Sequence, residues 1–187
     1  MSLKQQIFSI SMCIFMLLFI AQACALSTVN FTGINTDVDF GNIEASLGAI
    51  GSISIGTNGN IAYSGSFSGP VIGTAGQVSF QLENGDNPGS ITLECSSSVT
   101  LATSGGNTIP LNNIEYALGA ASRGNFGTGS SCQGIGTTIT LSSLSTSSIY
   151  TLYFGGQLDF SVPYTYAGGF STANAGGSDI TIVIIRI

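Results

Sequence analysis

The chain has no histidine and no tryptophan, and only 6% of its 187 residues are charged. Without histidine, these residues can build neither a Ser-His-Asp triad nor a histidine-ligated metal centre. The 3 Lys and Arg residues stand against 9 Asp and Glu residues, which gives a formal net charge of −6. Nucleic-acid binding needs clustered Lys and Arg to neutralise phosphates, so that class of function is excluded.

The first 25 residues have the pattern of a secretory signal peptide. Lys4 precedes an apolar run from Ile7 to Ile20, and Ala23-Cys24-Ala25 follows it. This order predicts export to the periplasm, the cell surface or the extracellular space, with cleavage after Ala25. The run is shorter than the roughly 20 apolar residues of a spanning helix, which disfavours a retained membrane anchor. Lipidation of Cys24 is a third interpretation, which the residues before it fit poorly.

Cleavage would leave residues 26–187, which we expect to form one domain. The only lysine, Lys4, would be removed with the signal. Arg123 and Arg186 would then face all 9 acidic residues, a net charge of −7 (2 − 9). No proline-rich or charged linker divides this region, and we expect it not to span a membrane.

Two cysteines, Cys95 and Cys132, remain outside the signal. A pair of cysteines in an exported chain predicts one disulfide, although two free buried thiols are the alternative. Two thiols alone are too few for a metal site, and there is no C-x-x-C motif of the redox-active kind. We therefore expect a structural disulfide.

Short alternating or β-branched apolar runs recur along residues 26–187, and no segment has helical periodicity. Gly, Asn, Ser and Pro separate these runs, which predicts an all-β antiparallel sandwich or barrel. The expected strands are Val38–Ile43, Ile50–Ile55, Ile61–Phe67, Val78–Leu82, Ile91–Cys95, Val99–Ala102, Ile114–Leu118, Ile139–Leu141, Ile149–Phe154, Gln157–Val162 and Ile180–Ile187.

Turn signals separate several of these runs. Thr57-Asn58-Gly59-Asn60 predicts a tight hairpin, because Asn-Gly accepts the positive φ angles that such turns require. Asn84 to Gly89 predicts a second turn. Gly119 to Gly136 predicts a long loop, fastened to the sheet by Cys132, which is either functional or a stabilised excursion.

Two groups of oxygen-bearing side chains are candidates for calcium binding. Asp37 and Asp39 have a spacing that places both carboxylates on one face of a strand. Asp86, with Asn84 and Asn87, forms the other group. Complete loop signatures are missing from both, and edge solvation and turn formation explain them without a metal. We therefore expect no metal and no cofactor.

Catalysis has little support in this sequence. Gly65-Ser66-Phe67-Ser68-Gly69 places its serines on either side of the central position that a G-x-S-x-G nucleophile needs. A glycosidase would need two carboxylates and stacking aromatic side chains, and no pair of acids stands out. Tyr150, Tyr153, Tyr164 and Tyr166 lie in strand-like runs, where we expect them to pack. We therefore expect that the protein is not an enzyme.

Two features favour assembly with other chains. Ile180–Ile187 is apolar on both faces, so we expect it to be central in a sheet or covered on both sides. Edge strands are normally protected by lysine, other charges or proline, and residues 26–187 contain no lysine. An unprotected edge accepts a strand from another chain, whereas sheets that cover one another would give an ordinary monomer.

An ordered series of motifs resembles a known family. The series runs through Asp39-Phe40-Gly41-Asn42-Ile43, Val78–Leu82, Gly85–Gly89, Ile91–Leu93, Ser98–Leu101, Gly105–Ile109, Phe154-Gly155-Gly156-Gln157-Leu158 and a closing β-strand. It is similar to the exported bacterial family called domain of unknown function 4402, over roughly Val38 to Ile187. The resemblance implies an immunoglobulin-like β-sandwich, similar in pattern to spore-coat-U and fimbrial-subunit domains, and implies no catalytic residue.

These observations predict a non-enzymatic structural subunit of a fimbria-like or other surface assembly. The segment Leu26 to Thr36 would be a donor strand that complements a groove beside Ile180–Ile187. The expected partners are further copies, other pilus-like subunits and a periplasmic chaperone and usher. The alternative is a monomeric secreted adhesin or glycan-binding domain that uses the Gly119–Gly136 loop.

Overall fold

The computed structural model describes residues 28–35, 37–40, 44–45, 48–119, 124–160 and 174–187. Every regular element among them is a β-strand. The strands are β1 (Thr28–Asn35), β2 (Glu44–Ala45), β3 (Gly51–Ile55), β4 (Ile61–Tyr63), β5 (Phe67–Ser68), β6 (Gly76–Glu83), β7 (Gly89–Cys95), β8 (Val99–Ala102), β9 (Thr108–Leu118), β10 (Ser130–Ser131), β11 (Ile139–Leu144), β12 (Ile149–Phe160) and β13 (Ile182–Arg186).

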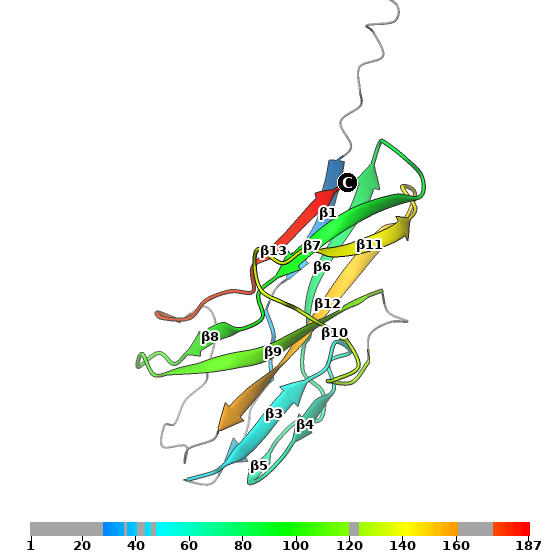
Figure 1. Cartoon of the computed structure of the whole chain (residues 1–187). Helices are drawn as coiled ribbons and strands as arrows, with labels where there is room; N and C mark the ends of the chain where they lie inside the picture. The colour runs from blue at the N-terminus through cyan, green and yellow to red at the C-terminus, as the bar shows by residue number, and fades with distance from the viewer. Residues whose placement is uncertain (1–27, 36, 41–43, 46–47, 120–123, 161–173) are drawn as a thin grey trace, which may run out of the picture.

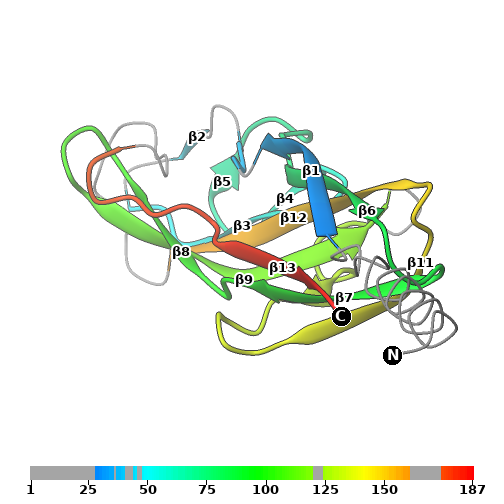
Figure 2. The same cartoon turned by 90° about the horizontal axis from the view of Figure 1, so that it is seen from above.

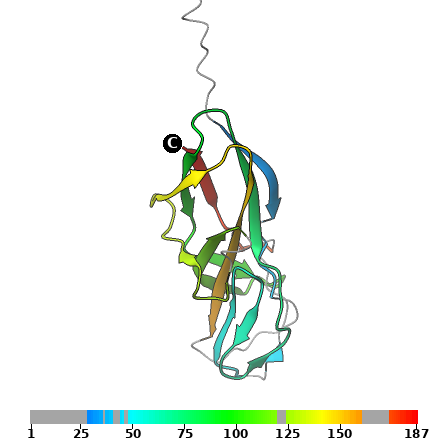
Figure 3. The ribbon, with the colours of Figure 1, turned by 90° about the vertical axis from the view of Figure 1, so that its right-hand side faces the viewer.

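Antiparallel pairing joins these strands into two main layers (Figures 1 and 3). The eight-stranded sheet follows the path β1-β6-β12-β3-β4 and also contains β8, β9 and β10. The second layer is the three-stranded sheet β11-β7-β13, and β2 and β5 form a separate pair. This arrangement confirms the predicted all-β antiparallel sandwich.

The core lies between the two layers and follows the alternation of each strand. In β6 and β7, every second residue is fully buried, including Phe80, Leu82, Ile91 and Leu93. Their neighbours in sequence face outward and are partly exposed, as the two-residue period of a strand requires. The predicted runs Val78–Leu82 and Ile91–Cys95 therefore identify the core faces correctly.

Strand β12 connects most of the larger sheet. One of its edges pairs first with β6, along Ile149–Phe154, and then with β3, along Gly156–Phe160. Its other edge pairs with β9. The two runs predicted separately, Ile149–Phe154 and Gln157–Val162, are thus one strand as far as Phe160.

Gly155 lies where β12 passes from β6 to β3. A Cβ atom at this position would come within 2.2 Å of the Ile55 carbonyl oxygen and 3.1 Å of the Thr57 nitrogen. Backbone atoms cannot move aside as the end of a side chain can. The hairpin between β3 and β4 therefore reaches across β12 because residue 155 has no side chain.

The two predicted turns are present. Gly56 to Asn60 connects β3 to β4, with Gly59 at φ 85°. Asn84 and Gly85 take φ angles of 60° and 73°, and the Asn87–Pro88 peptide bond is cis. Both Asn-Gly pairs thus lie in turns, as predicted, although in the first pair only Gly59 has a positive φ angle.

Other boundaries differ from the prediction. Of the expected strand Val38–Ile43, the described part makes a single bridge, between Asp39 and Thr74. The run Ile61–Phe67 divides into β4 and β5, which pair with different strands. The segment Leu26 to Thr36, predicted to be a donor strand, contains β1, which pairs with β6 of the same chain.

The prediction for the C-terminal strand is wrong. Strand β13 pairs with β7 on one side and forms an edge of the three-stranded sheet among the described residues (Figure 2). Ile184 faces the core, but Ile185 is 54% exposed on the outer face. A strand that is apolar on both faces is covered only if other parts of the chain pack against both faces. Here the described residues leave one edge and one face of β13 open.

Replacement of Gly155 by alanine should strongly destabilise the fold. Because the new methyl group would meet backbone atoms of the β3–β4 hairpin, we expect a loss of about 3 kcal/mol in unfolding free energy. Gly105→Ala is the matched control, since its nearest neighbour would be Thr103 Oγ1 at 3.7 Å. Chemical denaturation measures both, and equal stability of the two variants would contradict the crossing constraint.

Candidate functional site

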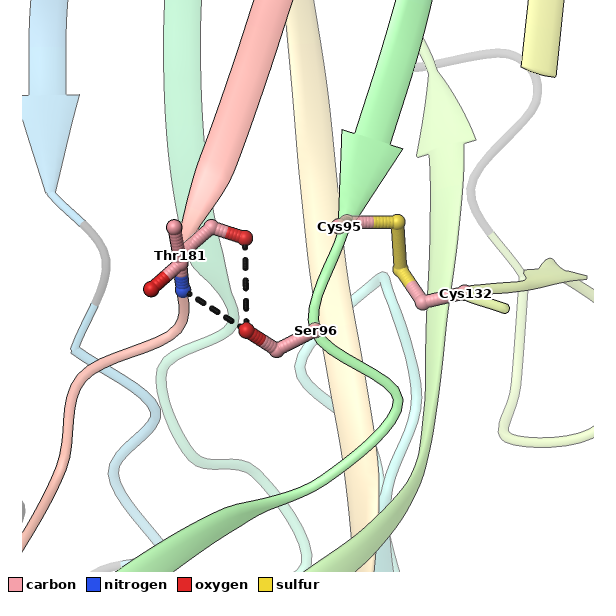
Figure 4. The surroundings of a disulfide bond; sticks show 4 residues. All are labelled: Cys95, Ser96, Cys132 and Thr181. Atoms are coloured by element: carbon pink, nitrogen blue, oxygen red, sulfur yellow. Dashed lines mark hydrogen bonds between the residues drawn. A yellow bond between two sulfur atoms is a disulfide. The ribbon is translucent and has the colours of Figure 1, made fainter. Parts of the chain in front are cut away.

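The disulfide lies between the two sheets. Cys95 ends β7, and Cys132 follows β10, with an S–S distance of 2.05 Å and a Cα–Cα distance of 5.3 Å (Figure 4). Both side chains are buried. The backbone N–H of Cys132 also donates to the Ile114 carbonyl at 2.8 Å. The predicted pairing of Cys95 with Cys132 therefore fastens the long loop to the three-stranded sheet and to β9.

Ser96, the residue after Cys95, holds the entry to β13. Its hydroxyl accepts the Thr181 N–H at 3.0 Å and donates to the Thr181 carbonyl at 3.4 Å (Figure 4). The backbone N–H of Ser96 donates to the same carbonyl at 3.0 Å. The end of β7 thus fixes the loop on one side and the start of the C-terminal strand on the other.

The described part of the Gly119–Gly136 loop is organised around Glu115, which is only 3% exposed. Its Oε2 accepts the N–H groups of Gly127 at 2.8 Å and Gly129 at 3.2 Å. Glu115 lies opposite Gly155 in the β9–β12 ladder. The carboxylate therefore ties the loop to the position where the hairpin crosses β12.

The second carboxylate oxygen of Glu115, Oε1, is buried without a hydrogen-bond partner among the described residues. The backbone amide of Thr57 acts on this carboxylate electrostatically and lowers its pKa, as do the two glycine N–H groups. Burial is the larger effect, and it raises the pKa of the Glu115 carboxyl above its ordinary value. Ionisation of Glu115 is thus less favourable in the folded chain than in the unfolded chain.

The hairpin turn makes a second set of contacts to the loop. The Thr57 hydroxyl accepts the Gly124 N–H at 3.0 Å, and the side chain is fully buried. Asn125 Oδ1 accepts the side-chain amides of Asn58 at 3.1 Å and Asn60 at 2.7 Å. The polar groups that line this part of the loop therefore bind one another.

The two groups of candidate calcium ligands lie in different parts of the fold. Asp37 and Asp39 are both exposed near the start of the described chain, and the Asp39 backbone pairs with Thr74. Asp86 lies in the turn after β6 and contributes its carbonyl to Arg186 at 2.7 Å. Within the described residues, no three His, Cys, Asp or Glu side chains gather as they would around a metal ion.

The remaining sequence candidates lie apart. Tyr150 and Tyr153 are partly buried in β12, as expected, and the Tyr150 hydroxyl accepts the Ser145 N–H at 2.6 Å. Phe67 of the Gly65–Gly69 segment packs against Phe160, with ring centroids 4.5 Å apart. Tyr164, Tyr166, Arg123 and the cleavage site at Ala25 lie outside the described residues.

Strand β13 has one edge that no described strand occupies. Ser96 N–H donates to the Thr181 carbonyl, and Ile187 N–H donates to the Ser90 carbonyl at 3.1 Å. Antiparallel ladders alternate, so odd-numbered residues of β13 direct their main-chain groups to β7. The main-chain groups of Ile182, Ile184 and Arg186 consequently point toward the open edge.

Sequence reasoning missed two of these features. Glu115 had a signal, since a lone acid within the apolar run Ile114–Leu118 must be either exposed or bonded. The edge position of β13 had no such signal in the sequence, because apolar content does not distinguish a covered face from an open one.

The described residues include no helix that could cross a membrane.

Comparison with known proteins adds one finding. A family model described as "Domain of unknown function (DUF4402)" matches residues 30–182. This range extends from within β1 to the first residue of β13. Searches of curated proteins and of solved structures found no significant match.

Removal of the disulfide by the paired change Cys95→Ala and Cys132→Ala should lower stability without changing the fold. The bond spans a sequence separation of 37 residues. For a loop of that length we expect a loss of about 4 kcal/mol. Thermal unfolding of the variant beside the oxidised protein measures this, and an unchanged midpoint would show that the loop contacts suffice.

Glu115 should make stability depend on pH in a defined direction. Its pKa is raised on folding, so the native state binds its proton before the unfolded state does. Its ionisation penalty is therefore relieved as pH falls through the raised pKa, and is fully relieved below the ordinary value. Glu115→Gln removes the charge and keeps an acceptor for Gly127 and Gly129.

The stability gain of Glu115→Gln over the original chain should consequently be larger at about pH 8 than at about pH 5. Denaturation midpoints at the two pH values measure the difference. Exposed acids contribute equally to both proteins and cancel in the comparison. A gain that grows as pH falls would contradict the assigned direction.

Proposed function

Because the chain belongs to the DUF4402 family, a family described without a function, we propose a function from its own residues. The protein is an exported, non-enzymatic structural subunit of a fimbria-like or other surface assembly. It joins other protein chains by accepting a β-strand at the open edge of β13. Its expected partners are further subunits and a chaperone that delivers them.

The uninterrupted edge of β13 carries this proposal. The opposite edge of the same sheet, β11, has a register shift between Leu141 and Leu144, with Ser143 at φ 63°. Strand β1, an edge of the larger sheet, has a shift between Phe31 and Gly33. Such bulges protect edges from strand addition. In contrast, β13 pairs with β7 in one continuous register.

Side-chain charge does not protect β13 either. Its only charged residue is Arg186, whose guanidinium donates to the carbonyls of Glu83 at 3.0 Å and Asp86 at 2.7 Å. The exposed residues beside the edge are apolar, Ile185 at the outer face and Ile187 at the end. Native edge strands normally carry lysine or proline at such positions. This edge is suited to strand addition.

The loop supports the alternative, a glycan-binding adhesin, less well. In its described part, the Asn125 side-chain oxygen is shared by two asparagine amides, and Glu115 Oε2 is shared by two glycine N–H groups. A binding loop needs polar groups directed at the ligand. Here those groups hold the loop to the hairpin and to β9.

The predicted donor segment Leu26 to Thr36 remains part of the proposal only in a conditional form. Its residues 28–35 pair with β6 of the same chain. To act as a donor, the segment would have to leave that strand. The acceptor role of β13 does not depend on this exchange.

The substitution Ile185→Lys should reduce assembly in the cell envelope while leaving the fold intact. A lysine beside the open edge opposes the approach of another strand. Ile149→Lys is the control, since Ile149 is 63% exposed and belongs to the other sheet. Cross-linking of the native envelope followed by gel electrophoresis measures high-mass species. A wholly monomeric original protein, or equal loss in both variants, would refute the proposal.

A further inference from the structure

Strand β1 is largely exposed, yet its apolar side chains share one face of the sheet. Val29 pairs with Leu82, Phe31 with Phe80 and Ile34 with Val78. All three β6 partners are buried core residues. Directly opposite residues of two paired strands lie on the same face. The apolar residues of β1 therefore lie on the inner face of the sheet, toward the second layer.

The bulge in β1 keeps these apolar side chains on one face. Phe31 and Ile34 are three positions apart, so in a regular strand they would lie on opposite faces. The register shift between Phe31 and Gly33 inserts one residue and returns Ile34 to the inner face. The bulge thus places Phe31 and Ile34 in one apolar row with Val29.

Val29 packs against the core, but the described residues leave the other two members of this inner row uncovered. Phe31 is 44% exposed and Ile34 is 67% exposed, whereas their partners in β6 are buried. The opposing sheet ends at β13 among the described residues, and β13 contacts β1 (Figure 2). A strand added to the open edge of β13 would continue that sheet over β1. We define Phe31, Ile34 and the open edge of β13 as the β1–β13 flank.

We propose that the β1–β13 flank binds one extended strand from another polypeptide, with β1 remaining on β6. The strand would pair with the outward main-chain groups of Ile182, Ile184 and Arg186, and its inner side chains would pack on Phe31 and Ile34. This inference rests on the proposed function, and it adds the place and the chemical character of the partner segment.

The flank defines the chemistry of that segment. Strand side chains alternate, so every second residue of the partner would face the apolar row and should itself be apolar. A charge at an inward position would be buried without an opposite charge, because the guanidinium of Arg186 is engaged by two carbonyls. The partner segment is therefore an uncharged, alternately apolar strand.

Exchange of β1 with a second copy of the chain would not bury Phe31 and Ile34. A β1 strand from another copy would reproduce the register with β6 that the chain already has. Phe31 and Ile34 of the incoming strand would then be as exposed as in the single chain. Only a strand beside β13 buries them.

The test uses the purified oxidised protein and a synthetic peptide of about seven residues in which Val and Thr alternate, a typical strand length. A peptide of the same composition, with its valines grouped together, is the control. Amide hydrogen exchange should show new protection at Ile182, Ile184 and Arg186, with β6 amides unchanged. The grouped peptide should give at least about tenfold weaker binding, a difference of about 1.4 kcal/mol.

The variant Ile34→Asp should weaken peptide binding by about tenfold or more, because it buries a carboxylate against an apolar strand. Ile149→Asp is the matched control, with 63% exposure against 67% for Ile34. Phe31→Ser is a second variant of the row. Since each of these side chains is at least 44% exposed, we expect all three variants to fold.

Three results would overturn the inference. In the first, the peptide protects β13 and binds the Ile34→Asp and Ile149→Asp variants equally well. This result would show that Phe31 and Ile34 do not contribute to binding, while strand addition at β13, and so the proposed function, would stand. Loss of protection in β6 on peptide binding would show exchange with β1. Unchanged β13 amides would contradict both the flank and the acceptor role.

Discussion

The crossing of the β3–β4 hairpin over Gly155 is the contact on which the rest of the larger sheet depends. At that residue, β12 exchanges one partner for another, from β6 to β3. A Cβ atom at residue 155 would lie only 2.2 Å from the carbonyl oxygen of Ile55. A side chain there would separate the hairpin from the sheet and remove the support that Thr57 gives to the long loop.

Glu115 extends this constraint across the β9–β12 ladder. Because Glu115 lies opposite Gly155, its buried carboxylate lies close to the point where the hairpin crosses β12 and where the loop packs. The two glycine N–H groups it accepts would otherwise need water or another acceptor. The loop carries the disulfide to Cys95, and the next residue, Ser96, holds the start of β13. The crossing, the loop and the C-terminal strand therefore form one connected frame.

Sequence patterns predicted the parts of this fold that depend on alternation or on turn chemistry. Val78–Leu82 and Ile91–Cys95 alternate cleanly and lie in β6 and β7, and the Asn-Gly pairs form the expected turns. The disulfide followed from the number of cysteines and the predicted export of the chain. The pairing of β1 with β6 of the same chain was missed because Gly33 and the bulge beside it break the alternation of the strand, although the same bulge keeps Phe31 and Ile34 on one face.

The edge position of β13 was beyond sequence reasoning for a different reason. The run Ile180–Ile187 contains the same residue types that a covered strand would have, and hydrophobicity alone does not identify what covers it. Pairing and exposure provide that information, because Ile184 is buried while Ile185 is not. Likewise, the single acid in Ile114–Leu118 could be recognised as unusual, but its glycine partners lie in a loop whose path no local pattern encodes.

A shortage of charge leaves a β protein with geometric means of protecting its edges. In this chain, β1 and β11 have bulges, and β4, β8 and β10 are short. Each device limits pairing with another strand without needing lysine. Strand β13 has neither device, and the only cation it carries is bound to carbonyls of the neighbouring turn. The other edges show that this sequence can protect a strand without lysine. The absence of such protection at β13, beside the exposed Phe31 and Ile34 of β1, is the reason why we propose that this edge binds a partner.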